Sequence, residues 1–166
     1  MARLATLEDL YIDQLQDLYS ANRQSLQATA RLREAAHAAP LQEALDRGVE
    51  GIQRGADALA GIIQQHGASP TEEFCQGMEG MVKEIESHVF EADFDDADVR
   101  DAMIIAQYQR MAHYAMAGYG CVRAYAARLG QDEEAATLQE CLSATHSGDQ
   151  QMTALAEGQV NAAAAS

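Results

Sequence analysis

The chain has 166 residues, a formal net charge of −15, 48% hydrophobic residues, two Pro and no Trp. This length predicts one domain spanning residues 1–166, large enough to bury a hydrophobic core. The negative charge argues against DNA or RNA as a partner and against an anionic membrane surface, because phosphates attract Lys and Arg. Abundant Ala, Leu, Gln, Glu and Arg favour helix along nearly the whole chain.

The cysteines and the N-terminus predict the compartment. Cys75, Cys121 and Cys141 are scattered and form no C-x-x-C pair, which fits reduced thiols packed as small hydrophobic side chains. The N-terminus lacks the cationic-then-apolar pattern of a signal peptide, and no apolar run reaches about 18 residues. We therefore expect a cytoplasmic protein with no membrane partner.

The first 66 residues predict two long antiparallel helices. Thr6 can cap the first helix, and leucines then recur near a 3.6-residue period to about Ala36. Pro40 suits the first turn of a second helix over residues 41–66. Gly67 then fits a left-handed position after the helix end.

A shorter third helix is expected between the two pairs of long helices. The segment Ser69-Pro70-Thr71-Glu72 has the residue types of a helix start, so this helix is predicted from residue 70 to about His88. The acidic segment Glu91–Asp98 interrupts the periodic pattern and predicts a loop.

Two further long helices complete the chain. The first is predicted over residues 98–129 with Gly130 as its stop, and the second opens at Asp132. An ordered core of residues 6–158 is expected, with an Ala-rich tail that frays. The fold class is therefore all-α: a ferritin-like four-helix bundle with an additional shorter helix between the two long-helix pairs.

Polar residues on the inner faces of this bundle are the candidates for a site, because core positions are ordinarily apolar. In carboxylate-bridged di-iron bundles, Glu and Glu-x-x-His residues project inward at mid-height. The corresponding layer in this chain is predicted to hold Asn22, Glu50, Gln53, Ala112, Ala115, Ser143 and His146. Only Glu50 and His146 are of the type that the template requires.

Three states of this layer are open: a dinuclear iron or manganese site, one weakly held cation, and a hydrogen-bonded layer without metal. Two cations need several carboxylates to offset their charge, so the third state is favoured. In that state Asn22 and Gln53 are the expected partners of Glu50, since amides donate to carboxylates. His113 and Tyr114 are expected to contribute to this polar layer from the helix predicted over residues 98–129.

Four stretches of the chain resemble the YciE/YciF ferritin-like family. They are LEDLYIDQLQDLYSANRQ, CQGMEGMVKE, DVRDAMIIAQYQRMAHYAMAGYG, and the Leu-Gly pair at residues 129–130. The resemblance covers nearly the whole chain, from Leu7 to about Ala156. It implies a ferritin-like helical bundle, a homodimer, an association with bacterial stress responses and, as in several members, a di-metal carboxylate site.

The chain departs from the family pattern at the metal positions. The Glu that follows Tyr-Ser-Ala in the family is Asn22, and the His three residues after Glu50 is Gln53. The Glu-His-Tyr-Glu motif reads Ala112-His113-Tyr114-Ala115. Ser143-Ala144-Thr145-His146 replaces the last acidic run. The resemblance therefore implies a member that keeps the scaffold and has lost the metal chemistry.

Two functions follow from these observations. The favoured one is a non-catalytic structural or binding protein without cofactor, and the alternative is a di-iron or di-manganese protein with ferroxidase-like or peroxide-handling activity. Aerobic oxidation of Fe(II) would separate the two. A third, weaker possibility is that the acidic segment Glu91–Asp98 binds a protein partner.

Overall fold

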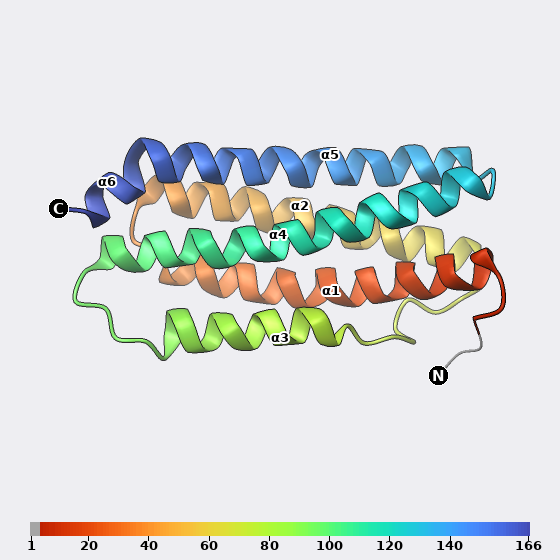
Figure 1. Cartoon of the computed structure of the whole chain (residues 1–166), viewed down its shortest axis with the longest axis horizontal. Helices are drawn as coiled ribbons and strands as arrows, with labels where there is room; N and C mark the ends of the chain where they lie inside the picture. The colour runs from red at the N-terminus through yellow and green to blue at the C-terminus, as the bar shows by residue number, and fades with distance from the viewer. Residues whose placement is uncertain (1–3) are drawn as a thin grey trace.

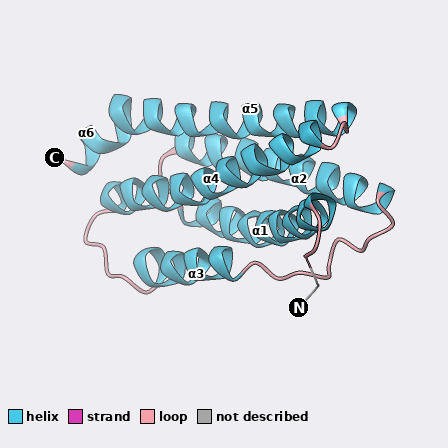
Figure 2. Ribbon diagram, turned by 45° about the vertical axis from the view of Figure 1, so that its right-hand side comes forward, coloured by secondary structure: helices cyan, strands magenta, loops and turns pink. Residues whose placement is uncertain are grey.

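The computed structural model describes residues 4–166, and these form helices joined by short connections, with no strand among them (Figures 1 and 2). The long helices are α1 (Leu7–Ala35), α2 (Ala39–Gln65), α4 (Ala97–Arg128) and α5 (Asp132–Leu155). Helix α1 pairs with α2, and α4 with α5, and the two pairs pack into a bundle. The ferritin-like arrangement with an extra short helix is confirmed.

The predicted helix ends agree with the structure at several positions. Thr6 caps α1 by accepting a hydrogen bond from the backbone N–H of Asp9, whose side chain accepts from the N–H of Thr6 in return. Pro40 lies in the first turn of α2. Gly67 and Gly130 have positive φ angles of 72° and 76° after the ends of α2 and α4. These angles favour glycine because a Cβ atom would be strained there.

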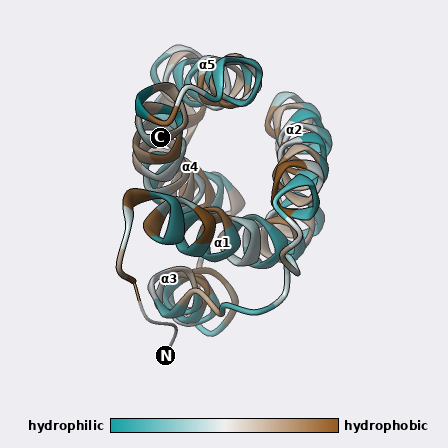
Figure 3. Ribbon diagram, turned by 90° about the vertical axis from the view of Figure 1, so that its right-hand side faces the viewer, coloured by the Kyte–Doolittle hydropathy of each residue, from teal (hydrophilic) through white to brown (hydrophobic). Residues whose placement is uncertain are grey.

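The predicted start of the third helix is wrong. Helix α3 covers Gln76–Ile85, and Cys75 caps it by accepting from the N–H of Met78. The Ser69 hydroxyl instead accepts from the N–H of Thr71, two residues on, in a local turn. The chain uses residues 66–75 to cross from the end of α2 to the outside of the bundle. There α3 packs beside α1 (Figure 3).

Helical structure continues beyond the predicted ends of the third helix and of the last helix. A π-helical turn at Glu86–Phe90 extends α3, and another at Ala156–Val160 leads from α5 into α6 (Asn161–Ala164). The acidic connection before α4 is non-helical as predicted, and Asp96 caps α4 through the N–H of Asp98. No helix in the described part of the chain is both long and apolar enough to cross a membrane.

The hydrophobic core consists of two clusters, one toward each end of the bundle. The first is centred on Leu32, Leu41 and Ile104, and the second on Leu15 and Leu59. Three polar residues in the middle of α1 are buried as well: Asn22, Ser25 and Thr29. The middle of the bundle is therefore where a site can form.

The N-terminus of α2 is held by a residue from α4. Asp101 is fully buried, and its two carboxylate oxygens accept from the backbone N–H groups of His37 and Ala38 at 2.8 and 2.7 Å. Ala38, at the cap position, has no side-chain acceptor of its own. A distant aspartate thus satisfies donors that a helix end leaves free.

Candidate functional site

A cavity of about 520 Å³ lies in the middle of the bundle, between α2 and α5. The view along the bundle axis shows these two helices side by side, with α1 and α4 completing the ring (Figure 3). Residues of both core clusters line the cavity, including Met111 and Tyr119. The cavity therefore lies where the two clusters meet.

Three of the predicted layer positions line this cavity: Asn22 on α1, and Ala112 and Ala115 on α4. All three are buried. Ala112 and Ala115 are three residues apart, which is the spacing of a ligand pair on one face of a helix. On α1 and α4, the predicted positions therefore lie on the cavity wall.

The prediction that Glu50 belongs to a buried polar layer is wrong. Its side chain is 72% exposed and its nearest cation is Arg54, 3.8 Å away on the same helix. Gln53, its expected partner, donates instead to Asp57 at 2.8 Å. Neither residue lines the cavity.

Glycines take the place of the expected polar residues on the inner face of α2. Gly48, Gly51 and Gly55 all line the cavity. Successive residues on a helix are 100° apart, so Gly51 and Glu50 cannot both point inward along the same direction. The helix turns its smallest side chains inward and its acid to solvent.

The predicted inward face of α5 is also wrong, because the helix is rotated about its axis relative to the prediction. Ser143 and His146 are exposed, and the residues of α5 that line the cavity at this level are Cys141, Ala144 and Thr145. His146 therefore does not contribute an imidazole to the interior.

The side of the cavity formed by α1 and α4, its floor, contains a short hydrogen bond between these two helices. Asn22 Nδ2 donates to Tyr119 Oη at 2.6 Å, and the two residues are 3% and 2% exposed. Burial, and then the neighbouring Cys141, raise the pKa of Tyr119 well above its usual value. Burial likewise raises the pKa of the Cys141 thiol. The floor is thus polar but uncharged at neutral pH.

Among the described residues, two buried residues of the cavity wall, Thr29 and Tyr108, have hydroxyl groups without partners. Thr29 Oγ1 is buried and has no hydrogen bond among the residues that the structure describes. Tyr108 Oη also has none within residues 4–166. It lies between α2 and α5, because a Cβ atom added to Gly48 would be 2.8 Å from it and one added to Gly148 would be 3.8 Å away.

The cavity does not fit a dinuclear metal site. Among residues 4–166, the lining residues with a carboxylate or thiol are Glu140, which is exposed, and Cys141. Between residues 4 and 166, no three His, Cys, Asp or Glu residues are placed to share a metal ion. Two divalent cations would require several anionic ligands.

The family model described as "Domain of unknown function (DUF892)" matches residues 6–165. The chain belongs to this family.

Individual relatives agree with this assignment. Protein YciF of Escherichia coli strain K12 is 31% identical over 159 residues, which is 95% of each chain. The crystal structure of the E. coli stress protein YciF matches with a TM-score of 0.88 and 31% identity, over 95% of this chain and 99% of that one. YcfI of Rhodopseudomonas palustris, proposed to be a structural protein, matches with a TM-score of 0.85 and 28% identity, over 92% and 97%.

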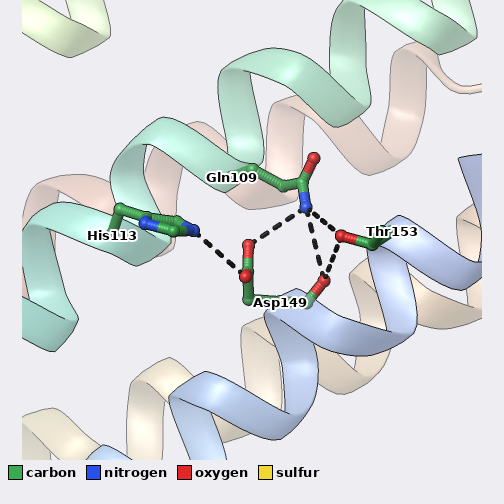
Figure 4. Close-up of polar contacts among 4 residues, drawn as sticks. All are labelled: Gln109, His113, Asp149 and Thr153. Carbon is green, nitrogen blue, oxygen red and sulfur yellow. Dashed lines mark hydrogen bonds and ion pairs between the residues drawn. The ribbon is translucent and has the colours of Figure 1, made fainter.

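His113, expected in the polar layer, instead joins α4 to α5 outside the cavity. Its Nε2 lies 3.0 Å from Asp149 Oδ2, and Gln109 Nε2 donates to Asp149 Oδ1 at 3.1 Å and to Thr153 Oγ1 at 2.8 Å (Figure 4). The His113 side chain is 63% exposed, whereas Asp149 is buried. This group is a polar clamp between two helices.

Tyr114, the other expected contributor, holds α3. Its hydroxyl lies 3.0 Å from Cys75 Sγ, and its ring packs against Gly77. Tyr119, one turn and a residue further on, takes the role in the cavity that the sequence prediction gave to Tyr114. Cys121, expected in the core, is exposed.

Sequence reasoning missed the inward-facing glycines and the role of Asp101. The glycine signal was present: Gly48, Gly51 and Gly55 recur at three- and four-residue spacing, which places them on one helix face. The partner of Asp101 is more than 60 residues away, so no local pattern could reveal it.

Proposed function

We propose that this chain is a ferritin-like family member that has lost its dinuclear metal site and acts as a non-catalytic binding or structural protein. The observation that carries this proposal is the composition of the cavity wall. Asn22, Ala112 and Ala115 occupy the inner positions where the family resemblance implies carboxylates.

The charge at these positions explains why metal binding would be lost. Iron and manganese ions in helical bundles are held by Glu carboxylates and His imidazoles from all four helices. The α2 wall offers glycines, and α5 offers Cys141 and Thr145. An amide, alkyl groups and hydroxyls cannot neutralise two divalent cations in a low-dielectric interior.

The relatives support a role in stress rather than in a defined reaction. YciF is described as a stress protein and YcfI is proposed to be structural. We extend this setting to the present chain, with a cytoplasmic location. A homodimer is proposed from the family resemblance, and size-exclusion chromatography with light scattering would test it.

The test is metal content combined with Fe(II) oxidation. We expect protein purified without added metal to contain far less than one iron or manganese per chain. We also expect aerobic Fe(II) oxidation at the rate of a Glu140→Gln/Cys141→Ser variant, which lacks the cavity's only acid and thiol. Two metal ions per chain, or oxidation well above that variant, would instead support a di-metal protein with ferroxidase-like or peroxide-handling activity.

A further inference from the structure

The cavity is long and narrow along the bundle axis. Its lining runs from Ala44 to Ala58 on α2 and from Thr137 to Gln151 on α5. At 1.5 Å of rise per residue, each stretch spans about 21 Å. The volume of about 520 Å³ lies within the range of small-molecule sites. These dimensions suit an extended ligand better than a compact one.

The part of the cavity wall near Gly51 is apolar. Gly51 faces open space: a Cβ atom placed there would meet nothing closer than an Arg54 nitrogen at 3.9 Å. Ile52 and Met111 line the same space together with the alanines of α4. Burying a hydrocarbon chain against such walls is favourable because it removes apolar surface from water.

The two unpartnered hydroxyl groups, on Thr29 and Tyr108, lie toward one end of the cavity, whereas Asn22 and Tyr119 bond to each other further along it. Asn22 lies against Gly55, and since α1 and α2 are antiparallel, Thr29 lies near the level of Gly48. The Tyr108 hydroxyl packs against Gly48, so the two unpartnered hydroxyl groups lie near the same end. The buried Thr29 hydroxyl is unfavourable without a partner, and a ligand oxygen at this end would pair with it and with the Tyr108 hydroxyl.

A cation lies at the same end. Arg47 precedes Gly48, lines the cavity and is exposed, and it forms no ion pair with any residue from 4 to 166. Arg54 also lines the cavity, but it lies 3.8 Å from Glu50, which offsets its charge. The negative Glu140 is on the opposite rim, on α5. This arrangement favours an anionic group on the α2 side, even in a chain with a net charge of −15.

We propose that the cavity binds a long-chain carboxylate, with the carboxylate at Arg47, Tyr108 and Thr29 and the hydrocarbon chain along Gly51 toward Gly55. This inference rests on the proposed function, because a dinuclear metal site would fill the same space.

Binding is tested by calorimetric titration of the purified full-length chain with dodecanoate and hexadecanoate, below their critical micelle concentrations. Dodecanol serves as the uncharged control. We expect saturable binding of one carboxylate per chain, at least about tenfold tighter than dodecanol, since one charge-assisted hydrogen bond accounts for about that factor. No saturable binding, or equal affinity for dodecanol, would overturn the proposal.

Variants locate the site. Gly51→Leu fills the cavity and is expected to weaken dodecanoate binding more than tenfold. The control is Gly61→Leu on the same helix, where an added Cβ atom meets nothing within 4 Å. This control should leave dodecanoate binding unchanged. Arg47→Gln changes an exposed residue, so it tests the site even if Gly51→Leu does not fold. It is expected to weaken dodecanoate binding about tenfold and to change dodecanol binding little. Wild-type affinity in either Gly51→Leu or Arg47→Gln would place any binding elsewhere and overturn the proposal.

Thr29→Val gives an independent readout. It removes an unpaired hydroxyl at constant shape, so we expect the ligand-free protein to melt at a higher temperature while dodecanoate binds several-fold more weakly. Unchanged affinity would remove Thr29 from the site and overturn the assignment of the carboxylate end.

Metal analysis of the same preparation separates this inference from the function on which it rests. Two iron or manganese ions per chain would overturn the proposed function. Metal-free protein that binds no carboxylate would overturn this inference alone.

Discussion

Asn22 and Tyr119 join α1 to α4 across the middle of the bundle, through a buried hydrogen bond of 2.6 Å. The same tyrosine hydroxyl is packed against Gly55 of α2 so closely that a Cβ atom there would overlap it. Three helices therefore meet at one phenol. The absence of a side chain at Gly55 is a packing requirement, although glycine is unfavourable within a helix.

Gly55→Ala should destabilise the protein despite the better helix propensity of alanine. The propensity gain is about 1 kcal/mol, whereas forcing a methyl group into packed surroundings costs about 1–3 kcal/mol. We expect a lower urea midpoint at an unchanged m-value. In the control, Gly61→Ala, the added methyl meets nothing within 4 Å, so stability should rise by about 0.5–1 kcal/mol. A rise in both variants would contradict the packing argument.

Asp101→Ala should be among the more damaging single substitutions at a charged residue. It removes the buried carboxylate that accepts from the N–H groups of His37 and Ala38 at a part-buried helix start, and a hydrogen bond to a charged group contributes about 1.5–3 kcal/mol. Chemical denaturation should show a loss of at least about 2 kcal/mol. Asp46→Ala, which removes an exposed ion pair with Arg33, should change the free energy of unfolding by less than about 1 kcal/mol. Equal effects would argue against the cap.

The helices and their order could be predicted from the sequence because the local signals agree. Thr6, Pro40, Gly67 and Gly130 mark helix ends through short-range sterics and hydrogen bonds. The start of α3 could not be predicted in this way. The segment at Ser69 has the residue types of a helix cap, but it is used to cross the bundle, and tertiary geometry decides between the two.

The candidate site was predicted only in part, because helix rotation decides which residues point inward. On α1, the leucine stripe defines the inward face, and Asn22 is buried beside it. At the level of the cavity, many inward residues of α2 and α5 are Gly, Ala, Cys and Thr, and such small residues do not by themselves mark a core face. The residue types alone then favour ionisable candidates such as Glu50 and His146, which the structure places in solvent.

High pH should destabilise the fold through the buried tyrosines. Burial raises the pKa of Tyr114 and of Tyr119 above the unfolded value of about 10. Below pH 10 both states hold these protons, and the full stability is present. Above it the unfolded chain releases protons that the native state retains, so the free energy of unfolding falls as pH rises. Thermal melts from pH 7 to 11 should show this fall.

Tyr119→Phe tests which residue is responsible for the alkaline effect. The variant should be less stable at pH 7, because Asn22 loses its partner. Its stability should nevertheless decline less steeply above pH 10, because one titrating group is gone. Tyrosinate absorbance measured alongside should show fewer late-ionising tyrosines than in the wild type. An unchanged slope would mean that Tyr119 ionises equally in both states.

Restoring carboxylates to the cavity should restore metal binding. In Asn22→Glu/Ala112→Glu/Ala115→Glu, three acids would share a buried space that now holds an amide and two methyl groups. Without metal the three would repel one another and resist ionisation, so the melting temperature should fall. Mn²⁺ should then raise it in a concentration-dependent way, because a ligand that binds only the folded state stabilises it. The matched Asn22→Gln/Ala112→Gln/Ala115→Gln variant fills a similar volume without charge and should show no Mn²⁺ dependence. If Mn²⁺ does not raise the melting temperature of the acidic variant either, the missing carboxylates are not what separates this chain from a metal-binding bundle.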